Sequence, residues 1–185
     1  MRKILFEGKF LRLLDEDSWE FADRPASAGI VSVVALDEED ILLVEQFRHA
    51  QQAAVVSLPG GLIDRPEAGQ RQESPVEAGR RELREETGYE AGRIAELVTG
   101  PISPGMTTET VTFVLAQDLV LAGPQMLDAN EKISLHRVPL LQLSDWLREK
   151  SARGSRIDLK VFVALYFLGS RGAGQETSRL GGFEP

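Results

Sequence analysis

Short apolar runs alternate with polar residues near the start of the chain, and their spacing indicates strands. Over residues 3–24 these runs predict two or three antiparallel strands, which end where Pro25 breaks the chain. The run AGIVSVVAL at 28–36 is almost entirely apolar, which is typical of a strand buried on both faces of a sheet. An acidic turn separates it from ILLVEQF at 41–47, which predicts the returning strand. The pattern therefore predicts a small β element followed by the sheet of a larger domain.

The second half of the chain continues with predicted strands and ends in predicted helices. Strands are expected in three segments: 93–99, 111–115 and 131–138. Pro139 suits the first position of a helix, and the mostly apolar segment 156–168 predicts a second helix. A chain of 185 residues suits one domain with small additions. We expect three parts: an N-terminal β element at 1–25, the main domain at 26–170 and a flexible tail at 171–185.

One predicted helix in the middle of the chain carries its own start and stop signals. Ser74 is a suitable N-cap, Pro75 suits the first helical position, and Glu77 completes a capping box. Gly88 is the type of residue that ends a helix. These signals predict a helix over 75–87.

Three carboxylates share one face of this predicted helix. Glu82, Glu85 and Glu86 stand at i, i+3 and i+4, so their side chains lie together and repel each other unless a cation sits among them. Oxygen ligands suit Mg²⁺ or Mn²⁺, and a backbone carbonyl from the turn at Gly60 would complete the set. The alternative is a solvated helix face on which neighbouring arginines screen the acids.

Composition limits the classes of partner. The formal net charge of −8 argues against nucleic acid and anionic membrane as partners, because a phosphate backbone is bound by clustered lysines and arginines. The absence of cysteine excludes disulfides, zinc thiolates and thiol catalysis. No apolar run is long enough to span a bilayer and no leader opens the chain, so we expect a cytoplasmic protein.

The segment from Gly61 to Tyr89 resembles the signature of the Nudix hydrolase family, G-x5-E-x7-R-E-U-x-E-E-x-G-U, in which U is aliphatic. The right half fits without gaps from Glu73 through Arg81 to Gly88, and only Tyr89 stands where an aliphatic residue is usual. The left half departs, because Glu73 comes 12 positions after Gly61 (73 − 61 = 12), twice the spacing in the pattern.

The extra residues of the left half fall within 64–72. Glu67 would satisfy the glycine spacing but would lie too far from Arg81, so we assign Glu73 to the signature position. We expect the insertion to lengthen an exposed loop at the mouth of the substrate site and to leave the helix intact.

The resemblance implies an α/β fold, the Nudix α/β/α sandwich with a mixed sheet, and an enzyme that hydrolyses a phosphoric anhydride. It also implies that Glu82, Glu85, Glu86 and Gly60 hold Mg²⁺ or Mn²⁺, which screens the substrate's diphosphate and lowers the pKa of bound water. We place Glu85 and Arg81 among the catalytic residues, with Arg81 acting mainly as the ion-pair partner of the signature glutamate before it.

Two further segments are similar to the branch of the family that hydrolyses ADP-ribose and related nucleotide sugars. A strand ending in Gln-Phe-Arg implies that Arg48 contacts the diphosphate or ribose through paired guanidinium donors. The loop SPGMTTE implies a catalytic glutamate, Glu109, that handles the attacking water, and we place Met106 with the substrate contacts. The alternatives are an arginine reaching solvent from a strand end and an ordinary polar residue at a strand start. Ser57 departs from this branch, where an acid is usual.

The segment SWEFADRP resembles the N-terminal element of the same branch, whose strands are exchanged in a homodimer. Carried over by position, Trp19 stacks on the adenine and Arg24 contacts the phosphates or ribose. The alternative is that Trp19 only anchors the small sheet. The resemblance therefore implies a homodimer that completes its substrate site between two chains.

The predicted function is Mg²⁺- or Mn²⁺-dependent hydrolysis of a nucleoside-diphosphate sugar, with ADP-ribose, giving AMP and ribose 5-phosphate, as the leading substrate. GDP-mannose, dinucleoside polyphosphates and non-standard nucleoside triphosphates stay open, because the signature specifies the diphosphate and leaves the flanking group free. A ligand-sensing module without catalysis is the alternative from another class, and the presence of all three signature glutamates argues against it.

Overall fold

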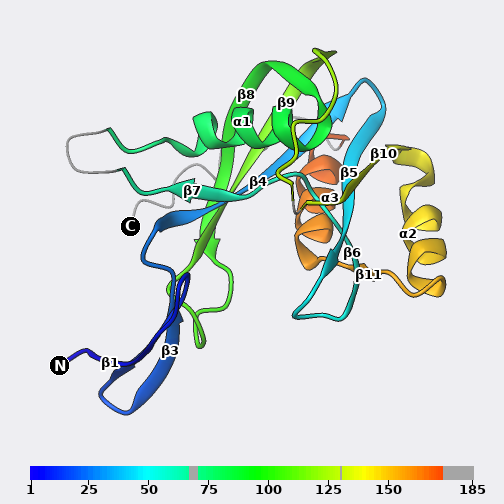
Figure 1. Ribbon diagram of the computed structural model, residues 1–185. Helices are drawn as coiled ribbons and strands as arrows, with labels where there is room; N and C mark the ends of the chain where they lie inside the picture. Colours follow the sequence, from blue (N-terminus) through cyan, green and yellow to red (C-terminus); the bar gives the residue numbers. More distant parts are fainter. Residues whose placement is uncertain (67–70, 130, 173–185) are drawn as a thin grey trace.

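The computed structural model describes residues 1–66, 71–129 and 131–172, and it contains one large mixed sheet and one small sheet (Figure 1). The strands of the large sheet are β4 (Ser27–Asp37), β5 (Asp40–Arg48), β6 (Ala53–Ser57), β7 (Leu62–Asp64), β8 (Tyr89–Pro101), β9 (Thr110–Leu121), β10 (Ile133–Pro139) and β11 (Arg156–Ile157). Their order is β11-β6-β5-β4-β9-β8, with β10 paired to β5 and β7 to β4. Only β4–β9 and β11–β6 run parallel among the pairs of described strands, so the predicted mixed sheet is confirmed.

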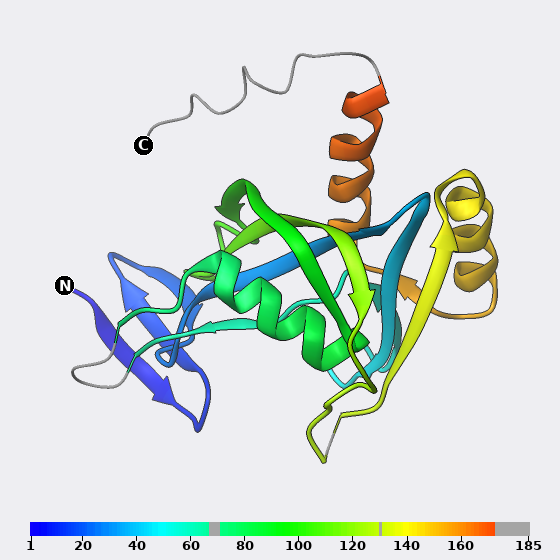
Figure 2. The same cartoon turned by 90° about the horizontal axis from the view of Figure 1, so that it is seen from above.

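Helices cover both faces of the large sheet, as Figure 2 shows from above. They are α1 (Pro75–Thr87), α2 (Leu143–Ala152) and α3 (Leu159–Gly172). Successive residues of β4 point to opposite faces, so Val31 and Val33 join the core beneath α1 while Val34 joins the core beneath α2 and α3. Each face of the sheet is therefore buried under helices, and the predicted α/β/α sandwich is confirmed.

The small sheet is built from the first strands of the chain, β1 (Lys3–Glu7), β2 (Arg12–Glu16) and β3 (Trp19–Asp23), in antiparallel order. It projects from the main body beside the loop that follows β8 (Figure 1). Ala22 joins the two parts, since its N–H donates to the Met106 carbonyl at 2.8 Å and its carbonyl accepts from the Thr108 N–H at 3.1 Å. The N-terminal β element is thus hydrogen-bonded to the loop that carries Glu109.

The helix predicted at 156–168 begins three residues late. Arg156–Ile157 instead forms β11, which pairs with β6 in parallel register. Asp158 then precedes α3, and its carboxylate accepts from the Lys160 N–H at 2.9 Å. The prediction was wrong at this boundary because hydrogen bonds to a distant strand hold the first two residues extended.

The observed ends of other helices and strands also differ from the predicted ends by a few residues. The helix predicted from Pro139 starts as a 3₁₀ turn over Leu140–Gln142 before α2 begins. The strand predicted at 111–115 continues to Leu121 because β8 pairs along its whole length. Residues 171 and 172 of the predicted tail belong to the last turn of α3, and the remainder, 173–185, lies outside the described residues. Across the described part of the chain, no helix has the length and apolar character needed to cross a bilayer.

Candidate active site

Helix α1 begins and ends at the residues that its capping signals predict. The Ser74 hydroxyl accepts from the Glu77 N–H at 3.3 Å, and the Glu77 carboxylate accepts from the Ser74 N–H at 2.9 Å, so the capping box is formed. Gly88 ends the helix with φ of +80°, and a Cβ there would lie 2.2 Å from the Gly123 carbonyl oxygen. These two ends fix which side chains of α1 face the site.

Arg81 braces the loop before α1 against the helix. Its guanidinium contacts both carboxylate oxygens of Glu73, at 3.0 and 3.2 Å, and donates to the Leu62 carbonyl at 2.9 Å. The predicted ion pair with Glu73 is therefore present, whereas Glu67 lies outside the described residues. The same guanidinium donates to Glu82 at 2.7 Å and to Glu85 at 3.2 Å. These carboxylates raise the pKa of Arg81, so it stays charged.

Glu82 and Glu86 carry the negative charge of α1 into a cavity. Burial raises the pKa of Glu86 to about 8, and the charge of Glu82 adds to the increase, although a hydrogen bond from the Gly60 N–H opposes it. That bond is 2.8 Å long. Burial also raises the pKa of Glu82, against the hydrogen bond and charge of Arg81, which lower it. Both carboxylates are thus held where negative charge is poorly stabilised.

Two glycines let the turn before β7 lie directly against β4 and α1. Gly60 has φ of +152°, and a Cβ on it would come within 2.2 Å of the Val31 carbonyl oxygen. A Cβ on Gly61 would lie 2.3 Å from a carboxylate oxygen of Glu82. The Val31 and Val33 N–H groups bond to carbonyls on either side of Gly60. The backbone of this turn is therefore held against the buried carboxylates.

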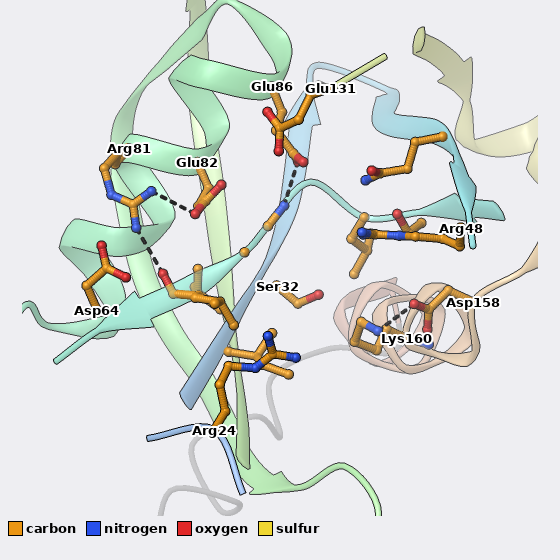
Figure 3. A pocket seen from close by; sticks show the side chains of 18 residues that line it. Arg24, Ser32, Arg48, Asp64, Arg81, Glu82, Glu86, Glu131, Asp158 and Lys160 are labelled. Carbon is orange, nitrogen blue, oxygen red and sulfur yellow. Dashed lines mark hydrogen bonds and ion pairs between the residues drawn. The ribbon is translucent and has the colours of Figure 1, made fainter. Parts of the chain in front are cut away.

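The cavity in front of α1 has a volume of about 480 Å³, and opposite charges line its two walls (Figure 3). The carboxylate wall contains Glu82, Glu86 and Glu131, with Arg81 bonded to Glu82. The cationic wall contains Arg24, Arg48 and Lys160, which come from the end of β3, the end of β5 and the first turn of α3, with Asp158 paired to Lys160. A molecule bound here would meet cationic side chains facing a cluster of carboxylates.

Six of the predicted site residues line this cavity: Arg24, Arg48, Gly60, Arg81, Glu82 and Glu86. The other four do not. Glu85 turns toward Arg81, and its side chain is 37% exposed. Trp19, beside the turn between β2 and β3, is 70% exposed, and Met106, in the loop between β8 and β9, is 71% exposed. The predicted metal contact of Glu85 and the predicted substrate contacts of Trp19 and Met106 therefore stay predictions.

Glu109 lies in a neighbouring cavity of about 170 Å³. Its carboxylate accepts from the Arg24 Nε at 2.8 Å, and the pair is partly buried. Arg24 lines both cavities, so two residues predicted for separate roles contact each other. In this arrangement Glu109 does not reach the larger cavity, where the attacking water would lie, and the catalytic role of Glu109 stays a prediction.

Sequence reasoning missed several residues that line the larger cavity. Glu131 lies just before β10, and its negative charge contributes to raising the pKa of both Glu82 and Glu86. Asp158 and Lys160 form an ion pair of 2.5 Å at the start of α3. Neither a single acid in a polar loop nor a lysine in an apolar helix can be recognised as a site residue from its neighbours in the sequence. Pairing between strands that are far apart in the chain brings these residues to the site.

The carboxylate wall suits a divalent cation by its chemistry. Among the described residues no three His, Asp or Glu side chains come close enough to form a preassembled metal site, and Arg81 holds both Glu82 and Glu85. Burial raises the pKa of Glu86, and it raises that of Glu82 although Arg81 lies 2.7 Å away, so a further cation would stabilise the charged form of both carboxylates. Hard oxygen donors of this kind match Mg²⁺ or Mn²⁺.

Comparisons with known proteins identify the family and support the fold. Residues 24–158 match the NUDIX domain. The chain is 31% identical over 146 residues to the ADP-ribose pyrophosphatase of Bacillus subtilis strain 168, which covers 74% of this chain and 75% of that protein. It is 30% identical over 177 residues to the methanol dehydrogenase activator of Bacillus methanolicus, covering 89% and 88% of the two chains. The crystal structure of an ADP compounds hydrolase superposes with a TM-score of 0.72 at 20% identity, over 95% of each chain, and supports the fold.

Proposed function

The chain belongs to the Nudix family of pyrophosphohydrolases, and we propose that it hydrolyses the diphosphate bond of a nucleoside-diphosphate sugar with Mg²⁺ or Mn²⁺ as cofactor. ADP-ribose is the leading substrate, with AMP and ribose 5-phosphate as products. The similarity to an ADP-ribose pyrophosphatase supports this choice. Family membership, together with the complete set of signature glutamates, argues against the alternative of a non-catalytic ligand-sensing module.

The observation that carries the proposal is the pair of opposed walls in the larger cavity. A diphosphate is anionic along its length, so the guanidinium groups of Arg24 and Arg48 would hold its oxygens with directed donors. The carboxylates opposite would repel the same anion without a cation between them. Glu82, Glu85, Glu86 and the Gly60 carbonyl are the groups that would hold this cation. When bound, it would supply charge screening and a lowered pKa for its water.

Two glutamates are candidates for positioning or deprotonating the attacking water. Glu109 is the candidate that follows from the resemblance, but Arg24 already occupies its carboxylate. Glu131 lines the larger cavity with Glu82 and Glu86, and its carboxylate has no ion-pair partner among the described residues. A general base must reach the proton that it removes, so geometry favours Glu131.

We further propose that the active enzyme is a homodimer in which the N-terminal β element of one copy completes the site of the other. No aromatic side chain is present among the described residues that line the larger cavity, so a nucleotide base has nothing to stack on there. Trp19 is 70% exposed, and apolar side chains of the same element, including Phe6 and Phe10, are also exposed. A three-stranded sheet with an uncovered apolar face needs a partner surface.

The proposed function is tested by a substrate panel with the purified chain. ADP-ribose, GDP-mannose, a dinucleoside polyphosphate and a non-standard nucleoside triphosphate are incubated with Mg²⁺, with Mn²⁺ and with EDTA, and the nucleotide products are separated by ion-exchange chromatography and quantified. We expect the largest kcat/KM for ADP-ribose, no hydrolysis in EDTA, and recovery when metal is returned. Hydrolysis in EDTA, or a clear preference for a substrate without a sugar beyond the diphosphate, would contradict the proposal.

A further inference from the structure

Two serine hydroxyls on the floor of the larger cavity have no protein partner. Ser32 is 1% and Ser57 is 6% exposed, and both line the cavity. Neither hydroxyl forms a hydrogen bond with another described residue. In the described part of the chain, every polar side-chain atom that is closed off from solvent does have a hydrogen-bond partner. The two hydroxyl oxygens are therefore open to the cavity, as Figure 3 shows for Ser32 between the two walls.

The sheet fixes both serines in place. Ser57 ends β6, opposite Val44 of β5. Ser32 lies in β4 on the face opposite Val31 and Val33, beneath the turn at Gly60, where a Cβ would come within 3.1 Å of the Ser32 Cα. Strands at the centre of a packed sheet move little, so the hydroxyls are held in position before a ligand arrives.

An ion pair lies beside Ser57. The Asp158 N–H donates to the Val56 carbonyl at 2.9 Å, which continues the pairing of β11 with β6 and places Asp158 next to Ser57. Lys160 contacts the Asp158 carboxylate, and their side chains are 21% and 23% exposed. The Ser57 hydroxyl, a carboxylate and an ammonium group therefore meet at this corner of the cavity, and Ser32 lines the same cavity from β4.

The chemistry of these groups selects the kind of ligand. A hydroxyl both donates and accepts, and a carboxylate accepts from O–H groups, so together they match sugar hydroxyls. The Asp158–Lys160 pair has no net charge to hold a terminal phosphate, and a base would find no aromatic face among the described lining residues. A sugar hydroxyl at this corner would therefore find both donors and acceptors.

We propose that Ser32 and Ser57, with the Asp158–Lys160 ion pair beside them, form a subsite that binds hydroxyl groups of a sugar attached to the substrate's diphosphate. This inference rests on the proposed function and specifies it further. The subsite lies at the cationic end of the cavity, so the diphosphate would extend from it toward Glu82 and Glu86. The bound sugar is either the nucleoside ribose or the terminal sugar, since both present the same hydroxyl chemistry.

The test compares three ligands against Ser32→Ala and Ser57→Ala. The ligands are ADP-ribose, the ethyl ester of ADP, which lacks the terminal sugar, and 2′,3′-dideoxy-ADP-ribose, which lacks the nucleoside hydroxyls. Both Kd by calorimetry and kcat/KM are measured. Each variant should weaken binding and lower kcat/KM for ADP-ribose by about tenfold, the value of one hydrogen bond. The effect should vanish on the one analogue whose missing sugar occupies the subsite. Ser134→Ala, an exposed serine of β10 outside the cavity, is the matched control.

The outcomes separate the subsite from the proposed function. Equal losses on all three ligands, or no loss on any, would overturn the subsite. A fall in the unfolding temperature of either variant would show that the hydroxyl supports the fold and would also overturn it, because loss of an unpartnered hydroxyl should leave stability unchanged or higher. If the wild type binds ADP-ribose without hydrolysing it and the variants lose binding selectively, the subsite stands and only the proposed function fails.

Discussion

Helix α1 brings three of its four predicted site residues to the cavity within one chain, whereas the N-terminal β element brings one of its two. Arg81, Glu82 and Glu86 line the cavity from α1. From the N-terminal β element only Arg24, at its end, reaches the cavity, while Trp19 is 70% exposed. The residues of the proposed chemistry are therefore complete in the monomer, whereas the residues of base recognition are not.

The difference has a physical cause. α1 is capped at both ends and packs on the sheet through Leu83 and Gly79, where a Cβ would come within 2.8 Å of Val114. The N-terminal β element has no comparable cover, since all five residues of β1 are exposed. Packing fixes side chains only where another surface meets them. We therefore expect substitutions in α1 to act on chemistry in each chain and substitutions in the N-terminal β element to act through assembly.

The largest effect is expected from the two buried carboxylates of α1. Glu82→Gln and Glu86→Gln should each lower kcat by about a thousandfold or more, because each removes a negative oxygen donor for the cation. The fold should survive, since the change also removes repulsion between the two side chains. Steady-state kinetics with saturating Mg²⁺ measure the effect, and Glu96→Gln, an exposed residue of β8, is the control. Full activity in either variant would remove the basis of the proposed chemistry.

The same variants give a second, independent readout in metal-free protein. The pKa of Glu86 is raised from 4.5 to about 8, so the folded chain keeps a proton that the unfolded chain loses. The resulting stabilisation is fully present below pH 4.5 and is lost as the pH rises toward about 8. Glu86→Gln should remove this decline in the free energy of unfolding, and an unchanged pH dependence would contradict the burial assigned to this carboxylate.

The next prediction compares Glu131, which lines the larger cavity with the carboxylates of α1, and Glu109, which contacts Arg24 of the N-terminal β element. Glu131→Gln should lower kcat by about a hundredfold or more with little change in KM, as expected for loss of a general base. Glu109→Gln should mainly raise KM, because Arg24 loses the partner that holds it at the cavity. The reverse pattern, with kcat lost only in Glu109→Gln, would assign the water to Glu109 as the resemblance predicts.

The residues of the site that lie on α1 could be predicted from the sequence, whereas several of those brought in by distant segments could not. α1, its caps and the shared face of its three carboxylates could be predicted from spacing along one element, and the resemblance to the family signature then indicated that the carboxylates form a site. The Glu73–Arg81 ion pair was also predictable, because both residues belong to the signature. Local spacing is therefore sufficient where the parts of a site lie on one element.

The remaining lining residues depend on contacts between distant segments. Lys160 reaches the cavity because β11 pairs with β6 and delays the start of α3, a boundary that apolar periodicity placed too early. Ser32 faces the cavity because its side chain points to that side of β4, a strand that is otherwise mostly apolar. Glu131 is one acid in a polar loop. None of these contacts is encoded by neighbouring residues, and so the sequence did not reveal them.

The smallest effect is expected at Trp19, and it tests the N-terminal side of the comparison directly. Stacking on a base contributes about 1–3 kcal/mol in proteins that bind single strands, so Trp19→Ala should raise KM for ADP-ribose by about tenfold to a hundredfold with kcat less affected. Tyr166→Ala, which removes an exposed aromatic residue of α3, should leave KM unchanged. The wild type should be a dimer by light scattering, because the element that carries Trp19 would complete the site of the second copy. A monomer that is fully active would refute the shared site. A dimer whose Trp19→Ala variant keeps its KM would show instead that Trp19 anchors the small sheet at the interface.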